Sequence, residues 1–265
     1  MAHPHHGNDF PQTAEIILSL PFILGIVIYL FMMIYTNKQG RKWPIYRAFL
    51  WVSGSFLSLI AVAGPLAELS HTDFRVHMIG HLLLGMLGPL LMVLGAPVTL
   101  LLRSLPVRQA RRVTKLFRSK IAEFLSHPLV TSTLNIGGLW VLYTTNLYVM
   151  MHEYMWLHIV VHLHVFLAGY LFTVSMIYID PIPHRRSFFS RSIILVLALA
   201  AHGILSKYIY YTPPIGVPPY EAEVGGMIMY YGGDAVDLII IIILCAQWYK
   251  ATKPRVHRKQ KLASI

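Results

Sequence analysis

Two pairs of histidines are the residues of this sequence whose type and spacing could do chemistry. His77 and His81 lie four positions apart, and so do His158 and His162. Side chains at positions i and i+4 of a helix project from one face, one turn apart. Imidazole is a common metal ligand, and one ion can bridge two rings at this spacing. The sequence therefore predicts a metal or cofactor site built from two ligand pairs.

Other candidate ligands occur in further apolar segments. His202 and Asp234 lie in two of them, and Met227 is seven positions before Asp234 and so on nearly the same helical face. Mixed histidine and thioether ligands favour copper, Cu(I) over Cu(II), whereas a histidine and carboxylate set would equally admit zinc. The complete predicted metal set is His77, His81, His158, His162, His202, Asp234, Met227 and Met78.

The elements that carry these residues are apolar enough to cross a membrane. The 265 residues are 56% hydrophobic and 12% charged, with a mean hydropathy of +0.59, which excludes an ordinary soluble domain. Apolar segments at about 14–36, 44–67, 75–102, 128–150, 154–179, 190–211 and 224–249 are each long enough to span the hydrocarbon core. We expect an all-α integral membrane protein, a bundle of seven transmembrane helices. Residues 1–13 and 251–265 are expected to be tails on either side of this domain at 14–250, and the first tail has three histidines that could gather metal or have no specific role.

Basic residues predict the orientation. The segments 37–47, 103–120, 180–191 and 250–261 contain 20 of the 22 Lys and Arg residues, and they all lie on one side of the predicted bundle. By the positive-inside rule the N-terminus is outside and the C-terminus is cytoplasmic. The net charge of +11 is therefore explained by topology and contact with the lipid bilayer, and we expect no nucleic-acid partner.

The two histidine pairs are predicted to share one depth in the outer leaflet. His77 and His81 lie ~3–9 Å below the outer end of their span, and His158 and His162 lie ~6–12 Å below theirs. Polar groups are costly in hydrocarbon, so their coincidence in depth indicates a common purpose. The histidines at span ends, in loops or off the paired faces are expected to form ordinary hydrogen bonds: His71, His127, His152, His164, His184 and His257.

Three segments resemble the CtaG family of bacterial cytochrome c oxidase assembly factors. The segment from His77 to Pro106 is similar to the family's His-Met-x-x-His helix with its Gly-x-Pro exit. His158 to Phe172, with Gly169, resembles its second histidine helix, and Gly225 to Gly233 resembles its Gly-Gly-x-x-Met-Trp-x-x-Gly signature, with Tyr230 in place of Trp.

This resemblance implies a multi-pass protein of the bacterial plasma membrane that is not an enzyme. It implies a role in maturing a haem–copper oxidase by supplying copper to the copper B centre of the catalytic subunit. An extracytoplasmic copper donor protein is a further expected partner. Two other functions fit the residues: a membrane cytochrome with bis-histidine haem, and a copper permease, whose polar groups would continue toward the inner side.

Overall fold

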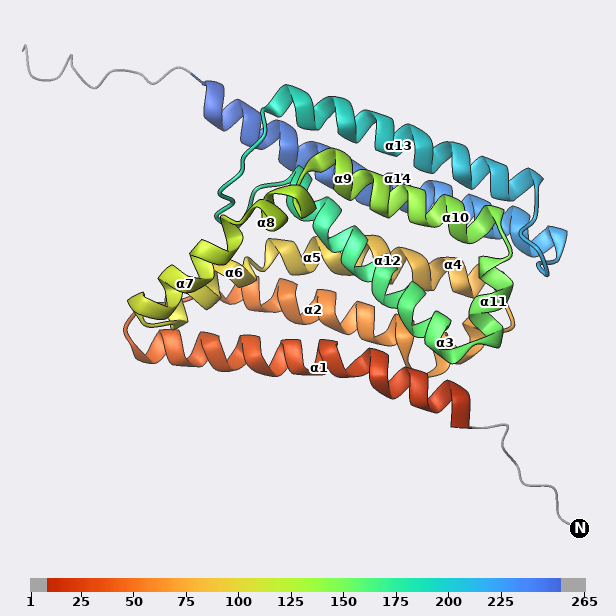
Figure 1. Ribbon diagram of the computed structural model, residues 1–265, viewed down its shortest axis with the longest axis horizontal. Helices are drawn as coiled ribbons and strands as arrows, with labels where there is room; N and C mark the ends of the chain where they lie inside the picture. The colour runs from red at the N-terminus through yellow and green to blue at the C-terminus, as the bar shows by residue number, and fades with distance from the viewer. Residues whose placement is uncertain (1–8, 254–265) are drawn as a thin grey trace, which may run out of the picture.

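The computed structural model describes residues 9–253, and every regular element in that part is helical (Figure 1). Six of its helices are long and apolar enough to cross a membrane, consistent with a multi-pass membrane protein. They are α1 (Asp9–Lys38), α2 (Ile45–Val62), the rod formed by α4 (Phe74–Leu82), η1 (Leu83–Leu87) and α5 (Gly88–Leu94), then α12 (Met155–Met176), α13 (Phe188–Tyr211) and α14 (Pro219–Thr252).

The segment predicted as a span at 128–150 is broken in the structure. It consists of α9 (Pro128–Ser132), η2 (Thr133–Gly137) and α10 (Gly138–Thr144), followed by a separate helix, α11 (Leu147–Glu153), which turns away from α10 (Figure 1). The break occurs at Thr145, whose backbone is extended and whose hydroxyl accepts a hydrogen bond from the Leu147 amide. The predicted end at residue 150 was therefore wrong, while the count of seven spans and the orientation stay predictions.

Two further predicted spans ended too late, both where glycine and proline stand close together. The segment at 44–67 ends at Val62 because Gly64 has a φ of 81° and Pro65 begins α3 (Pro65–Ser70). The segment at 75–102 ends at Leu94, since Ala96 is left-handed (φ 52°) and Pro97 begins α6 (Pro97–Ser104). Proline disfavours helical geometry in the residue before it, which explains both stops.

A π-helical turn begins two residues after His81, where α4 ends. This turn, η1, packs against α12, where Gly85 and Gly169 bring the two backbones together. A side chain at Gly169 would overlap the Gly85 carbonyl, so the absence of a Cβ is what allows this approach. The close packing fixes α4 and α12, the helices with the two histidine pairs, relative to each other.

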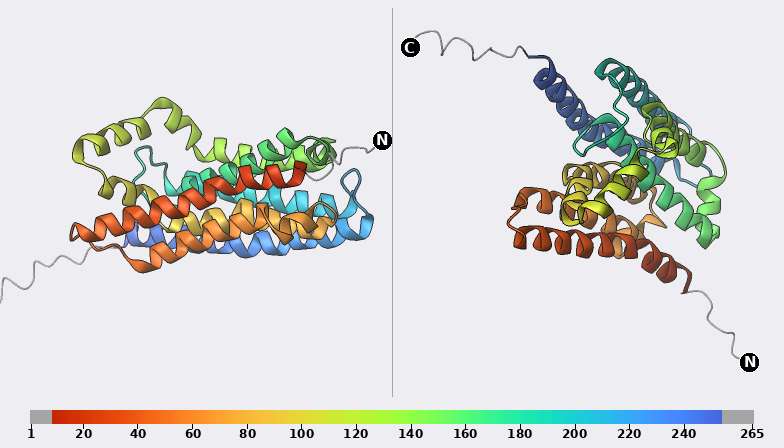
Figure 2. Two further views of the ribbon diagram at one scale, coloured as in Figure 1. Left: turned by 90° about the horizontal axis from the view of Figure 1, so that it is seen from below. Right: turned by 60° about the vertical axis from the view of Figure 1, so that its left-hand side comes forward.

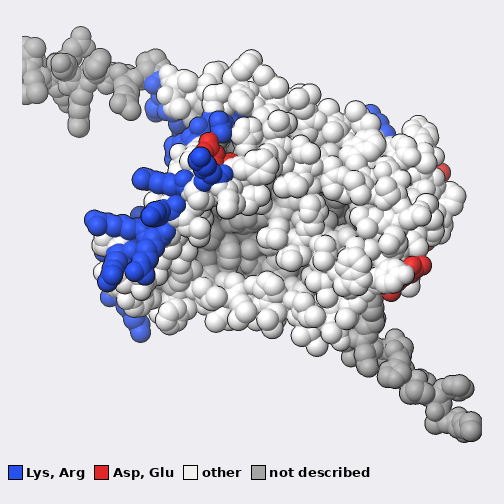
Figure 3. Space-filling model, in the orientation of Figure 1, with Lys and Arg blue, Asp and Glu red and all other residues white. Residues whose placement is uncertain are grey.

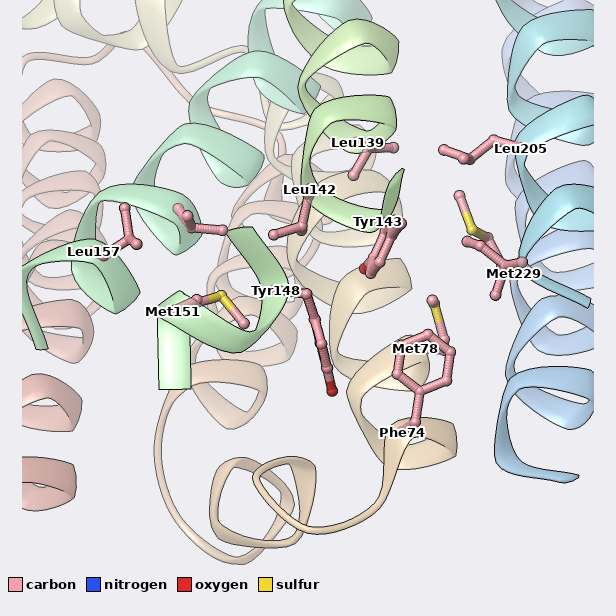
Figure 4. Packing of buried hydrophobic residues seen from close by; sticks show 12 residues of the cluster. Phe74, Met78, Leu139, Leu142, Tyr143, Tyr148, Met151, Leu157, Leu205 and Met229 are labelled. Carbon is pink, nitrogen blue, oxygen red and sulfur yellow. The ribbon is translucent and has the colours of Figure 1, made fainter. Parts of the chain in front are cut away.

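The two ends of the bundle differ in charge. Lys and Arg gather at the end with α7 (Val107–Phe117) and α8 (Lys120–Leu125), which form an arm that projects from the bundle (Figures 2 and 3). The opposite end contains α3, α4 and α11 (Figure 1). There Phe74, Met78, Tyr143, Tyr148 and Met151 belong to one buried cluster that surrounds the start of α4 (Figure 4).

Candidate metal centre

The structure brings the five histidines of the predicted set into one region. His77 and His81 on α4, His158 on α12 and His202 on α13 are buried, and His162 is half-buried. The ring centres of His158 and His162 are 4.1 Å apart, and those of His81 and His202 are 6.5 Å apart. Gly233 of α14 allows the His202 ring to approach, because a Cβ at this glycine would overlap that ring.

Two histidines that we expected to form only ordinary hydrogen bonds complete the cluster. His71, between α3 and α4, has its ring centre 5.2 Å from that of His158 and 5.6 Å from that of His152 on α11. The His77 and His152 ring centres are 6.3 Å apart. These contacts join the two predicted pairs, which otherwise belong to separate helices.

A repeated spacing could have identified these two residues. His71, His77 and His81 are separated by six and then four positions, and His152, His158 and His162 are separated in the same way. Each segment enters its helix from a turn at the end opposite the basic residues. The pattern His-x5-His-x3-His thus marks both halves of the cluster.

A small cavity lies within the cluster. It has a volume of about 20 Å³, enough for one water-sized particle, and its lining includes His77, His81, His162, Tyr143 and Met151. The His77 Nε2 atom lies 3.1 Å from the hydroxyl of Tyr143, which holds this ring against α10. Imidazoles, a phenol and a thioether therefore line one small cavity.

Several ring nitrogens are available as ligands. His81 Nε2, His158 Nδ1 and His202 Nε2 are buried and have no hydrogen-bond partner. A buried polar atom without a partner costs about 1–3 kcal/mol, so this arrangement favours an additional bound group. The Nδ1–H of His162 donates to the His158 carbonyl at 2.9 Å, and that of His152 donates to the Tyr148 carbonyl at 2.8 Å, which leaves both Nε2 atoms as acceptors.

Two ring separations between different segments fit shared ligation of an ion by a pair, whereas the ring centres of the predicted pair His158 and His162, 4.1 Å apart, are too close for it. A metal–imidazole bond is about 2.0–2.1 Å, so two rings on one ion have centres roughly 5–6.5 Å apart. The separations from His71 to His158 and from His81 to His202 are within that range. Among residues 9–253, however, no three His, Cys, Asp or Glu side chains are placed to hold one ion together. The geometry favours two-ligand coordination or rearrangement when an ion enters.

The electrostatics of His71 favour a neutral ring. Burial lowers the pKa of His71 below its ordinary value, the neighbouring His152 lowers it further, and Glu15 opposes both effects. A neutral imidazole can bind a metal ion without first losing a proton. His71 is therefore ready to act as a ligand at neutral pH.

The other three predicted ligands do not lie with the histidines. Asp234 is exposed on the outer face of α14, and Met227 is 42% exposed beside Lys207 and Tyr230. Met78 is buried but packs toward Phe74 and α14 (Figure 4). The three histidines of the N-terminal tail lie outside the described residues.

A second cavity of about 20 Å³ lies closer to the basic end. His202, Asp237, Asn135 and Thr173 contribute its polar lining. Asp237 is buried one turn beyond Gly233, so α14 presents this carboxyl to the interior in place of Asp234. Asn135 belongs to the π-helical turn η2, an irregularity that often occurs at functional sites. His202 thus lines this cavity and also contacts the histidine cluster through His81.

Comparison with known proteins identifies the chain's relatives. The curated relatives include uncharacterized proteins of Mycobacterium leprae and Mycobacterium bovis, each 28% identical to this chain over 89% and 95% of its length. The chain spans only 38% and 40% of those two proteins. No solved structure matches it. Residues 27–251 match the model of the cytochrome c oxidase caa3 assembly factor family, as the resemblance of the histidine and glycine motifs implied, and the chain belongs to this family.

Proposed function

We propose that this chain acts in the assembly of a haem–copper cytochrome c oxidase by holding copper in the histidine cluster and delivering it to the copper B centre of the catalytic subunit. Family membership supports the role in oxidase assembly. The observation that carries the copper assignment is the set of three buried ring nitrogens without partners, on α4, α12 and α13. Copper is the cargo in this proposal, and the protein catalyses no reaction.

The ligand types support Cu(I) as the cargo. Imidazole and thioether are suitable ligands for copper, and Met151 lines the same cavity as His77 and His81. A donor must release its ion, so pairs of ligands that exchange serve better than a closed four-ligand site. The cluster's position, at the end opposite the basic residues, suits an acceptor centre buried in the outer half of a membrane subunit.

The cavity argues against the haem alternative. Cofactor pockets have volumes of about 300–1,000 Å³, whereas the space between these rings is about 20 Å³. A porphyrin would require α4 and α12 to separate, although Gly85 and Gly169 are in close contact just beneath the histidines. We therefore place the copper donor before the cytochrome.

Copper content of the purified full chain tests the proposal. We expect the protein to bind Cu(I) after reconstitution under reducing conditions, and replacement of His77 and His81, or of His158 and His162, by Ala to abolish stoichiometric binding. His164→Ala is the matched control, because its Nε2–H donates to the Leu134 carbonyl and its ring is outside the cluster. Equal copper content in both double variants and the control would refute the site.

A copper permease is the second candidate, and the cavity at Asp237 favours it. Polar groups that continue from His81 through His202 to Asp237 are what a path toward the basic side requires. Copper flux into proteoliposomes separates the two functions. A permease predicts copper uptake that Asp237→Asn reduces. A donor predicts copper binding without flux in both the unmodified chain and the Asp237→Asn variant.

A further inference from the structure

A groove at the basic end of the bundle is lined by four cationic side chains. It lies between α6 and α7, has a volume of about 530 Å³, and includes Arg41, Arg111, Lys115 and Arg118. Arg111 and Lys115 lie one turn apart on the same face of α7, and Arg118 is the residue that directly follows this helix as its C-cap. The groove lining contains no Asp or Glu.

These four cations have no acidic partner. The ion pairs found between residues 9 and 253 involve Asp73 and Glu123, and neither acid pairs with a groove residue. Arg41 instead donates to the carbonyl of Arg103 at 3.2 Å. Like charges that share one groove repel each other, so an anion bound there would stabilise the arrangement.

α6 and α7 form a hairpin, and an apolar cavity of about 280 Å³ lies on the bundle side of this hairpin. Its walls come from α5, α6, the end of α7, α8, α12 and the segment 180–183, and they include Val98, Phe117, Leu171 and Val174. Figure 3 shows an uncharged hollow between the basic arm and the body of the bundle, at this place in the fold. The one acid in the lining, Asp180, accepts hydrogen bonds from the amides of α6 at 3.1 and 2.8 Å and from the Thr99 hydroxyl, so it adds little repulsion.

The groove and the cavity are neighbours along both helices of the hairpin. Val98 lines the cavity, and Leu102, one turn further along α6, lines the groove. At the end of α7, Phe117 likewise lines the cavity and the next residue, Arg118, lines the groove. In addition, α7 buries none of its residues in the bundle and leaves Leu116 68% exposed, which is typical of a helix at a membrane surface.

We propose that this hairpin binds one anionic phospholipid of the leaflet on the basic side. The phosphate lies in the groove against Arg111, Lys115 and Arg118, and an acyl chain occupies the apolar cavity. A free phosphate would use the cations but would leave the cavity empty, and a zwitterionic lipid would offer them no net charge. The site thus combines the two features that together distinguish an anionic lipid.

Lipid binding by the full chain in detergent, measured by native mass spectrometry with phosphatidylglycerol as the probe, tests this proposal. Each cation near a phosphate contributes about fivefold, so Arg111→Gln with Arg118→Gln should weaken binding roughly 30-fold. Arg108→Gln with Arg112→Gln is the control, because it removes the same charge from α7 outside the groove lining. Thermal unfolding of both variants checks that they remain folded.

Three further comparisons make the outcome decisive. Phosphatidylcholine of equal chain length should bind at least tenfold more weakly than phosphatidylglycerol, and excess inorganic phosphate should displace little of the bound lipid. Val174→Phe should fill the cavity and weaken long-chain phosphatidylglycerol more than a short-chain form. The proposal would be overturned if the two double arginine variants lost equal lipid affinity or if phosphatidylcholine bound as well as phosphatidylglycerol. Full displacement of the bound lipid by inorganic phosphate would also overturn it. If Val174→Phe does not fold, the comparison of chain lengths in the unmodified protein tests the cavity.

Discussion

Replacement of Gly169 by alanine should disturb the histidine cluster without changing any of its histidines. An added Cβ would overlap the carbonyl oxygen of Gly85 and lie 2.8 Å from its carbonyl carbon. Carbon atoms approach comfortably to about 3.5 Å, so α12 must move away from η1 by at least roughly 0.7 Å. Gly169 is seven positions after His162, and Gly85 is four positions after His81. The shift therefore moves α12, with His158 and His162, away from α4, with His77 and His81.

The displacement sets the size of the two expected effects. Overpacking of this kind costs about 1–3 kcal/mol of stability. Metal–ligand distances tolerate only about 0.2 Å, so a larger shift of the supporting backbone should weaken Cu(I) binding about 10–100-fold. Competition with a Cu(I) chelator measures the affinity, and thermal unfolding in detergent measures the stability.

Gly25→Ala provides the control for Gly169→Ala. Its Cβ would meet only Trp51, at an ordinary 3.6 Å, so the same change of residue adds no overlap in α1. We expect this variant to retain copper affinity and to gain slightly in helix stability. If Gly169→Ala binds copper and unfolds like the control, the claim that glycine contact positions the two histidine helices is incorrect.

Three other predictions address topology, ligands and the α6 terminus. In a cysteine-free background, Cys introduced at Ile215 should react with an impermeant reagent in intact cells, whereas Cys at Leu116 should react only after permeabilisation; the reverse pattern would invert the bundle. His71→Ala with His152→Ala should weaken Cu(I) binding about 10–100-fold, and unchanged affinity would exclude both residues from the cluster's function. Asp180→Ala removes the bonds that hold the start of α6 and should cost about 2 kcal/mol in unfolding experiments, whereas a loss below 0.5 kcal/mol, as for an exposed residue, would show that the cap is not needed.

The sequence predicted the histidine layer because spacing and depth are local properties. The i and i+4 pairs needed only helical periodicity, and the structure gathers all five histidines of the predicted set. Six helices of the described residues are long and apolar enough to span a membrane, which is consistent with the predicted membrane character. The positions of span ends were less predictable, since Ala96 remains as apolar as its neighbours while its backbone leaves the helix.

The apolar pattern of α14 could not predict which face of this helix packs against the rest of the bundle. In a membrane helix the lipid-facing side is as apolar as the packed side, so hydrophobicity does not distinguish Asp234 from Asp237. The glycines do, because Gly225 and Gly233 are buried against α4 and α13 and lie on the same side as Asp237. Small residues are thus a better guide to the interior of this bundle than polar ones.

The copper content of the oxidase itself tests the central claim most directly. In cells that lack this chain, we expect the catalytic subunit to be inserted with its haems but without copper at copper B, and therefore to be inactive. Re-expression of the unmodified chain should restore the copper-to-haem ratio, whereas the His77→Ala, His81→Ala variant, present at equal abundance, should not. A normal copper-to-haem ratio and normal activity in the deletion strain would contradict the copper-donor function.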